Sequence, residues 1–97
     1  MNALTKNEVS EFLKASLKDW SYDGSSIHRD LKFKNFTEAF SFMTAVALEA
    51  EKADHHPDWS NVYNQVSINL NTHSAGGITK MDFELAQAID RILKKYQ

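Results

Sequence analysis

Pro57, the only proline in the chain, must end the longest helical pattern in the sequence. Asn35 can cap this helix with Glu38 at its third position, and apolar residues then recur at helical spacing. Because a proline removes a backbone hydrogen bond and clashes with the preceding turn, we expect the helix to end near Ala53. We expect its core-facing stripe to consist of Phe36, Ala39, Phe40, Met43, Val46, Ala47 and Ala50.

Two further helices are indicated by capping boxes, in which a threonine and an acidic residue three positions later satisfy each other's backbone N–H groups. Thr5 and Glu8 predict a helix that runs to about Lys18. Thr79 and Asp82 predict a last helix that runs to Tyr96.

Four short segments between these helices read as strands, at residues 20–22, 27–33, 59–64 and 66–71. Turn residues at 23–26 join the first two, and Asn64-Gln65 is the expected turn between the last two. Residues 73–77 read as a flexible loop. The order α-β-β-α-β-β-α predicts an α+β fold, with a four-stranded antiparallel sheet and three helices packed on one face.

Size and composition exclude several classes of protein. A chain of 97 residues that is 42% hydrophobic forms one domain, residues 1–97, around one core, and a domain this small is often stabilised as an oligomer. The net charge of −2 with scattered basic residues indicates no nucleic-acid partner, and no apolar run is long enough to span a membrane. The absence of cysteine excludes disulfides, thiolate chemistry and cysteine-based zinc sites. We expect a cytoplasmic protein, present also in the nucleus if the source is eukaryotic.

Three of the four histidines cluster around the expected exit of the long helix. His55 and His56 directly precede Pro57, and His73 follows the last strand. Imidazole exchanges protons near neutral pH, and loops beside rigid elements often carry reactive groups. The fourth, His28, falls on the exposed side of a strand and is expected to be inert.

Residue type alone leaves three interpretations of the cluster open: acid–base catalysis, a metal site completed by Asp54, Asp58 or Asp82, or ordinary polar loop residues. The metal hypothesis is the weakest, because adjacent histidines do not have the i, i+4 spacing of a helical zinc motif.

The residues next to the histidine cluster also have more than one interpretation. Glu51, one helical turn before His55, could hold that imidazole or face water, and Asp82 is better explained as a cap than as a catalytic group. Trp59 could stack on a flat ligand or belong to the core.

The same residues carry a resemblance. The segment from Glu51 to Trp59, EKADHHPDW, followed by Tyr63, His73 and Asp82 at matching spacing, resembles the pterin-4a-carbinolamine dehydratase family, also known as the dimerisation cofactor of a hepatocyte homeodomain factor. The match is dense from Glu51 to Asp82 and looser upstream.

The resemblance implies the same α+β fold, with dimers that join their sheets edge to edge and, in some members, tetramers formed through helices. It also implies a reaction: removal of water from 4a-hydroxytetrahydrobiopterin to give quinonoid dihydrobiopterin. This step recycles the pterin cofactor of aromatic amino acid hydroxylases, such as those that hydroxylate phenylalanine. Metal and cofactor are not required, since pterin is the substrate.

By resemblance, His55, His56 and His73 form the catalytic set, and we favour His56 for the central proton transfer. Substrate contacts would come from Asp54, His55, His56, Trp59, Asn71, Thr72, His73 and Ser74. Glu51, Pro57 and Asp82 would support the site. The alternative is a protein-interaction module of the same fold, a transcriptional coactivator with or without enzyme activity.

Overall fold

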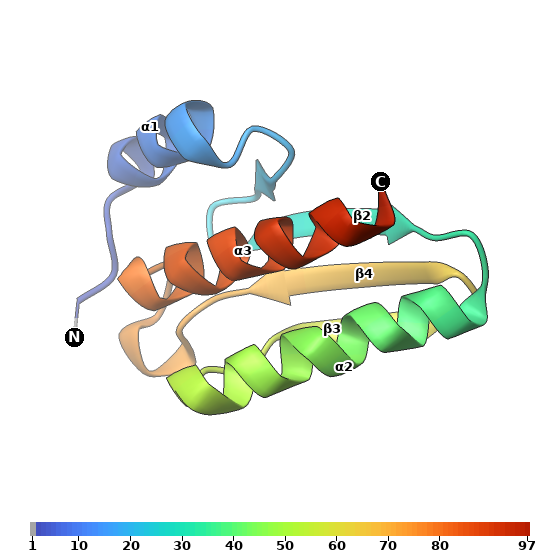
Figure 1. Ribbon diagram of the computed structural model, residues 1–97. Coiled ribbons are helices and arrows are strands. Elements are labelled where there is room, and N and C mark those ends of the chain that lie inside the picture. Colours follow the sequence, from blue (N-terminus) through green and yellow to red (C-terminus); the bar gives the residue numbers. More distant parts are fainter. Residues whose placement is uncertain (1) are drawn as a thin grey trace.

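The computed structural model describes residues 2–97 as three long helices and four strands (Figure 1). In chain order the elements are α1 (Lys6–Ser16), β1 (Ser21–Tyr22), β2 (Ile27–Lys32), α2 (Phe36–Ala53), β3 (Asp58–Val62), β4 (Gln65–Leu70), the short 3-10 helix η1 (His73–Ala75), α3 (Lys80–Leu93) and a terminal 3-10 turn η2 (Lys94–Tyr96). The α+β fold and its element order are therefore confirmed.

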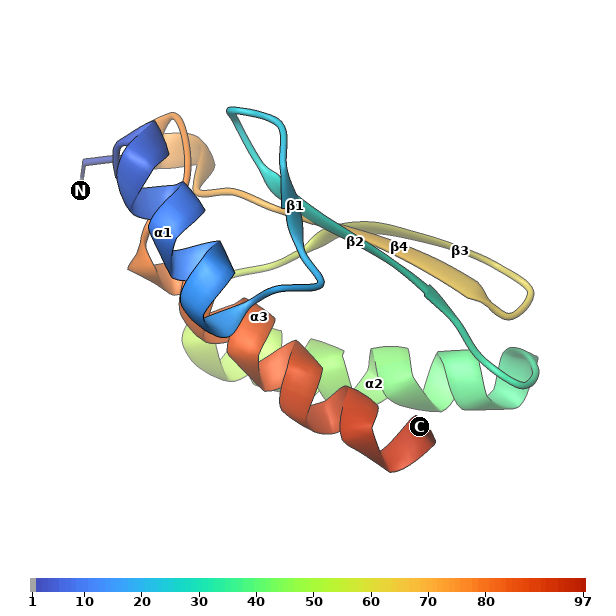
Figure 2. The same cartoon turned by 90° about the horizontal axis from the view of Figure 1, so that it is seen from above.

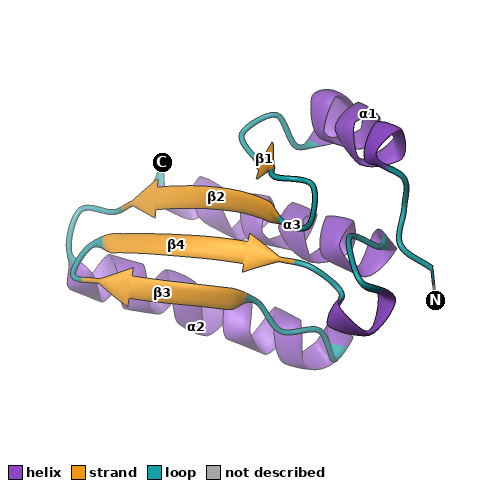
Figure 3. Cartoon of the chain, turned by 180° about the vertical axis from the view of Figure 1, so that it is seen from behind, coloured by secondary structure: helices purple, strands orange, loops and turns teal. Residues whose placement is uncertain are grey.

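The four strands form one antiparallel sheet in the order β1-β2-β4-β3, so the two hairpins meet through the β2–β4 pair. Figure 2 shows the sheet from its side, with α2 and α3 beneath it and α1 at the left, beside the start of α3. Figure 3 shows the opposite face of the sheet, which no helix covers. None of the helices within residues 2–97 has the length and hydropathy needed to cross a lipid bilayer.

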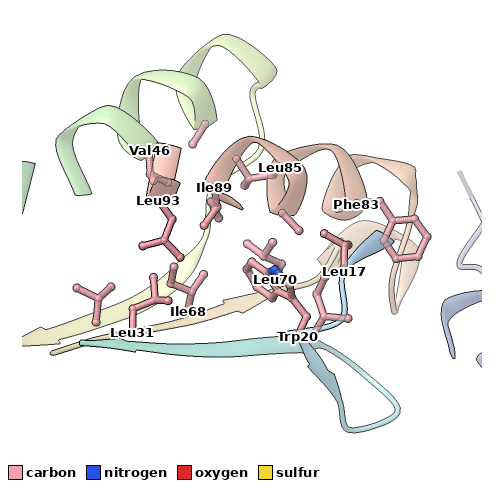
Figure 4. Packing of buried hydrophobic residues seen from close by; sticks show 14 of the residues in the cluster. Leu17, Trp20, Leu31, Val46, Ile68, Leu70, Phe83, Leu85, Ile89 and Leu93 are labelled. Atoms are coloured by element: carbon pink, nitrogen blue, oxygen red, sulfur yellow. The ribbon is translucent and has the colours of Figure 1, made fainter. Parts of the chain in front are cut away.

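The core lies between the sheet and the helices (Figure 4). Alternate residues of β4 point into it, and the amphipathic α3 covers them with residues spaced three and four apart. Its centre includes Val66, Ile68, Leu70, Leu85, Ile89 and Leu93.

The expected core stripe of α2 was partly wrong. Ala39, Phe42, Val46 and Ala50 are the buried positions, whereas Phe36 is 48% exposed, Phe40 is 57% exposed and Ala47 is exposed. The helix is apolar over more than one face, so two stripes compete for the core and only packing against α3 and the sheet selects one. The second stripe is left on the surface.

Two connections differ from the sequence expectation. The β3–β4 turn consists of Tyr63 and Asn64 rather than Asn64 and Gln65, and Tyr63 has a left-handed backbone with φ of 50°. The segment after β4, expected as a flexible loop, forms the hydrogen-bonded turn η1. The remaining boundaries shift by one to three residues, with α1 ending at Ser16 and α3 at Leu93.

Candidate active site

The histidine pair follows the C-terminal cap of α2. Asp54 caps the helix in the left-handed conformation, with φ of 50° and ψ of 43°, and its N–H donates to the carbonyls of Ala50 and Glu51. The next N–H, that of His55, donates to the Ala50 carbonyl at 3.1 Å, which completes a Schellman-type ending. The chain therefore reverses over one residue, and His55 turns back toward the interior.

His55 is buried and bonded to a buried carboxylate. Its Nε2 lies 2.6 Å from Oδ1 of Asp82, a residue with no exposed surface. The second oxygen of Asp82 accepts from the Thr72 hydroxyl at 2.8 Å and from the backbone N–H of Thr79 at 2.9 Å. A carboxylate that accepts the Nε2–H of an imidazole sets the tautomer and the orientation of the ring.

The buried group formed by His55, Thr72, Thr79 and Asp82, here called the Asp82 cluster, joins three parts of the fold. His55 follows α2, Thr72 follows β4, and Thr79 and Asp82 begin α3. Within residues 2–97 every buried side-chain nitrogen and oxygen has a hydrogen-bond partner, so the cluster is fully satisfied. Asp82 thus caps its helix, as expected, and also holds His55.

His73 lies on η1, directly after Thr72, and is exposed together with its neighbours Asn71 and Ser74. The turn closes where Gly76 adopts φ of 74°, a conformation that a residue with a Cβ rarely takes. The Thr72 hydroxyl, directly before His73, bonds to Asp82, the same carboxylate that holds His55. The Asp82 cluster therefore brings together the two segments from which the sequence predicts the site.

The His56 side chain, unlike that of His55, lies on the surface. Its Nε2 lies 2.7 Å from Glu51 Oε1, and both side chains are exposed. Of the two alternatives for Glu51, holding His55 is excluded: the left-handed turn at Asp54 sends His55 inward to Asp82 and leaves His56 beside the last turn of α2. Each of the paired histidines has its own carboxylate.

A pocket of about 370 Å³ adjoins His56 on the helix side of β3. Its walls are Ala47, Leu48, Ala50, Glu51, His56, Pro57 and Trp59. Trp59 is half-buried: it packs against the core and also lines this pocket. The pocket is apolar apart from the Glu51–His56 pair, which suits a flat heterocycle.

His28 lies on the helix-free face of the sheet, away from this pocket. Its Nε2 is 3.0 Å from Asp30 and its Nδ1 is 2.9 Å from the side-chain oxygen of Asn69. The hydrogen bonds to Asp30 and to Asn69 raise the pKa of His28 above its usual value, because only the protonated ring donates from both nitrogens.

Within residues 2–97, no three histidine, aspartate or glutamate side chains come together as the ligands of a metal ion would. The three histidines instead separate into one buried ring and two exposed ones.

A sequence model described as pterin 4 alpha carbinolamine dehydratase matches residues 2–92. The chain belongs to this family. A relative from Mesorhizobium japonicum is 56% identical over 89 residues, which cover 90% of this chain and 90% of that protein. One from Prochlorococcus marinus is 48% identical over 93 residues, covering 96% of this chain and 97% of the relative. Both are provisionally named pterin-4-alpha-carbinolamine dehydratases.

A solved structure extends the similarity to three dimensions. The crystal structure of a transcriptional coactivator/pterin dehydratase from Brucella melitensis superimposes with a TM-score of 0.88 at 46% identity, covering 94% of this chain and 98% of that one. Membership of the dehydratase family thus rests on both sequence and fold.

The contact between Thr72 and Asp82 was not predicted from the sequence. A threonine directly before His73 reads as one more polar residue at the end of a strand, and only the closure of α3 onto β4 brings its hydroxyl to the carboxylate. The spacing of Thr72, Thr79 and Asp82 around a glycine-rich turn was the available signal.

Substitutions of Asp54 test whether its side chain binds substrate or only caps the helix. Glycine adopts the left-handed conformation without steric cost, so Asp54→Gly should raise the free energy of unfolding by up to about 1 kcal/mol. If the Asp54 carboxylate contacts substrate, as the resemblance implies, the same change should lower kcat/KM. Urea denaturation and dehydratase assays measure the two effects.

Asp54→Asn is the matched control, since asparagine also tolerates this conformation but carries no charge. We expect it to lower kcat/KM with little change in stability. Full activity in both variants would show that Asp54 acts only as a helix cap.

Proposed function

We propose that this protein catalyses the dehydration of 4a-hydroxytetrahydrobiopterin to quinonoid dihydrobiopterin and water, as a hydro-lyase. The observation that carries the proposal is the Asp82 cluster, which joins the His55–His56 segment to the His73 segment. His56 also lines a pocket walled by Trp59. Membership of the dehydratase family supplies the substrate class.

The reaction needs two proton movements. The C4a–O bond breaks, and the leaving hydroxide takes a proton from one general acid to become water. A ring nitrogen of the pterin loses a proton to a general base, and its electron pair forms the new C=N bond. Positioned imidazoles can perform both steps, each typically accelerating a reaction by roughly 100- to 10,000-fold.

His56 is our candidate for the central proton transfer. It is exposed, lines the pocket, and has Glu51 at 2.7 Å to orient its ring. Because the Glu51 carboxylate accepts the Nε2–H, the other ring nitrogen of His56 is left to accept a proton.

His73 and His55 would complete the set. His73 is exposed on η1 and can reach a ligand directly, while His55 is held by Asp82 and presents only its outer edge. Trp59 would stack on the pterin, and the exposed Asp54, Asn71 and Ser74 would pair with its polar edge.

The product must then be reduced before an aromatic amino acid hydroxylase can use the pterin again. We therefore place the enzyme functionally beside such a hydroxylase in the cytoplasm, in a recycling step that keeps tetrahydrobiopterin available.

We also propose that the protein is a homo-oligomer, a dimer or a tetramer. Within residues 2–97, β3 pairs only with β4, so its outer edge is unpaired, and Val62 at its end is 74% exposed. An open strand edge of this kind favours pairing with another strand. The exposed stripe of α2, with Phe36, Phe40 and Leu48, offers a second apolar surface.

The same stripe favours the second candidate function, a protein-interaction module. A helix with exposed phenylalanine and leucine side chains can bind a partner's helix, and the Brucella protein is described as a transcriptional coactivator as well as a dehydratase. Binding of a helical peptide by a protein that lacks dehydratase activity would favour this function over the enzyme.

Sedimentation velocity tests the oligomer. We expect a mass two or four times 11.1 kDa at micromolar concentration. If a tetramer uses the α2 stripe, Phe40→Lys should reduce it to a dimer, because it places a charge in the apolar contact. A monomeric wild-type protein would contradict the proposal.

A hydroxylase-coupled assay of carbinolamine decay tests the activity. Wild-type protein should accelerate the decay above the spontaneous rate, and His56→Ala should lose at least 100-fold of kcat/KM, within the usual range for a general acid or base. His28→Ala is the matched control, since it removes an imidazole from the opposite face of the sheet and should keep wild-type kcat/KM. If the wild-type protein leaves the spontaneous rate unchanged, the dehydratase proposal fails.

A further inference from the structure

We propose that Thr72 is a positioning residue that sets His55 and His73 relative to each other, an inference that rests on the dehydratase function proposed above. Its side chain bonds to the carboxylate that holds His55, and its main chain anchors the turn that carries His73. The resemblance implies a substrate contact for Thr72, whereas the structure assigns its side chain to the interior.

The direction of each hydrogen bond in the Asp82 cluster follows from counting protons. The Thr79 hydroxyl accepts from the N–H of Met81 at 3.2 Å and lies 2.7 Å from the Thr72 hydroxyl. Thr72 donates its only hydroxyl proton to Asp82, so it must accept from Thr79. The protons thus point in sequence from Met81 through Thr79 and Thr72 to Asp82.

This arrangement leaves the Thr72 side chain without a free donor, and one of its lone pairs is already used. Thr72 is 5% exposed, unlike its exposed neighbours Asn71, His73 and Ser74. A hydroxyl buried and bonded in this way does not reach a ligand, so its effect on catalysis must pass through Asp82 and His55.

The main chain of Thr72 has an equally defined role. Its N–H donates to the Gly77 carbonyl at 2.8 Å, and its carbonyl accepts from the N–H groups of Ala75 at 3.0 Å and Gly76 at 3.1 Å. These bonds close η1 around His73. A shift of the Thr72 side chain would therefore displace both the exposed histidine and the buried one.

Thr72→Val and Thr72→Ser separate the hydroxyl from the shape of the side chain. Valine keeps the volume but cannot donate to Asp82, so we expect kcat to fall about tenfold, with KM within about twofold of wild type. Serine keeps the donor and should restore kcat to within about twofold. The ¹⁵N shifts of the His55 ring report its hydrogen bond to Asp82, so they should change in Thr72→Val and match the wild-type shifts in Thr72→Ser.

A core variant controls for loss of stability alone. Ile89→Val truncates a fully buried side chain in α3 that takes no part in the cluster, so it should lower Tm and keep kcat and the His55 ring shifts. The proposal is overturned if Thr72→Val keeps wild-type kcat, or if valine and serine lower kcat equally. If the wild-type protein is active, those outcomes refute the role of Thr72 but not the dehydratase function. An inactive wild-type protein refutes the dehydratase function itself.

Discussion

The rest of the site depends on one buried carboxylate, that of Asp82. A charge without exposed surface is costly unless donors surround it, and here an imidazole, a hydroxyl and a backbone N–H do so. Those donors come from the end of α2, the end of β4 and the start of α3. Folding the core therefore also assembles the site, because satisfying Asp82 requires all three elements to be in place.

In the proposed mechanism, His55 supports the site while His56 and His73 transfer protons. His55 is buried against Asp82, whereas His56 and His73 are exposed on the two segments that the cluster joins. A rigid interior with reactive groups on short flanking segments is how a small domain can position two proton-transfer groups.

Much of the fold was readable from local signals. The capping threonines, the alternation along the strands and the proline after α2 act within a few residues, so the element order and the helix starts were predicted correctly. The stripe of α2 and the partner of His55 were not, because both depend on tertiary contacts. Left-handed backbone at Asp54 and Tyr63 also overrides the usual preference of these residue types, and it decides the direction of His55 and the register of the β3–β4 turn.

The rate of carbinolamine dehydration with Asp82→Asn tests most directly whether the Asp82 carboxylate organises the site. The amide places an N–H where Asp82 accepts hydrogen bonds, so His55 or the Thr72–Thr79 pair must move. The predicted result is a loss of at least tenfold in kcat, with circular dichroism unchanged from wild type and Glu84→Gln, an exposed carboxylate two residues on, fully active. Wild-type kcat in a folded Asp82→Asn protein would contradict the claim that this carboxylate organises the site.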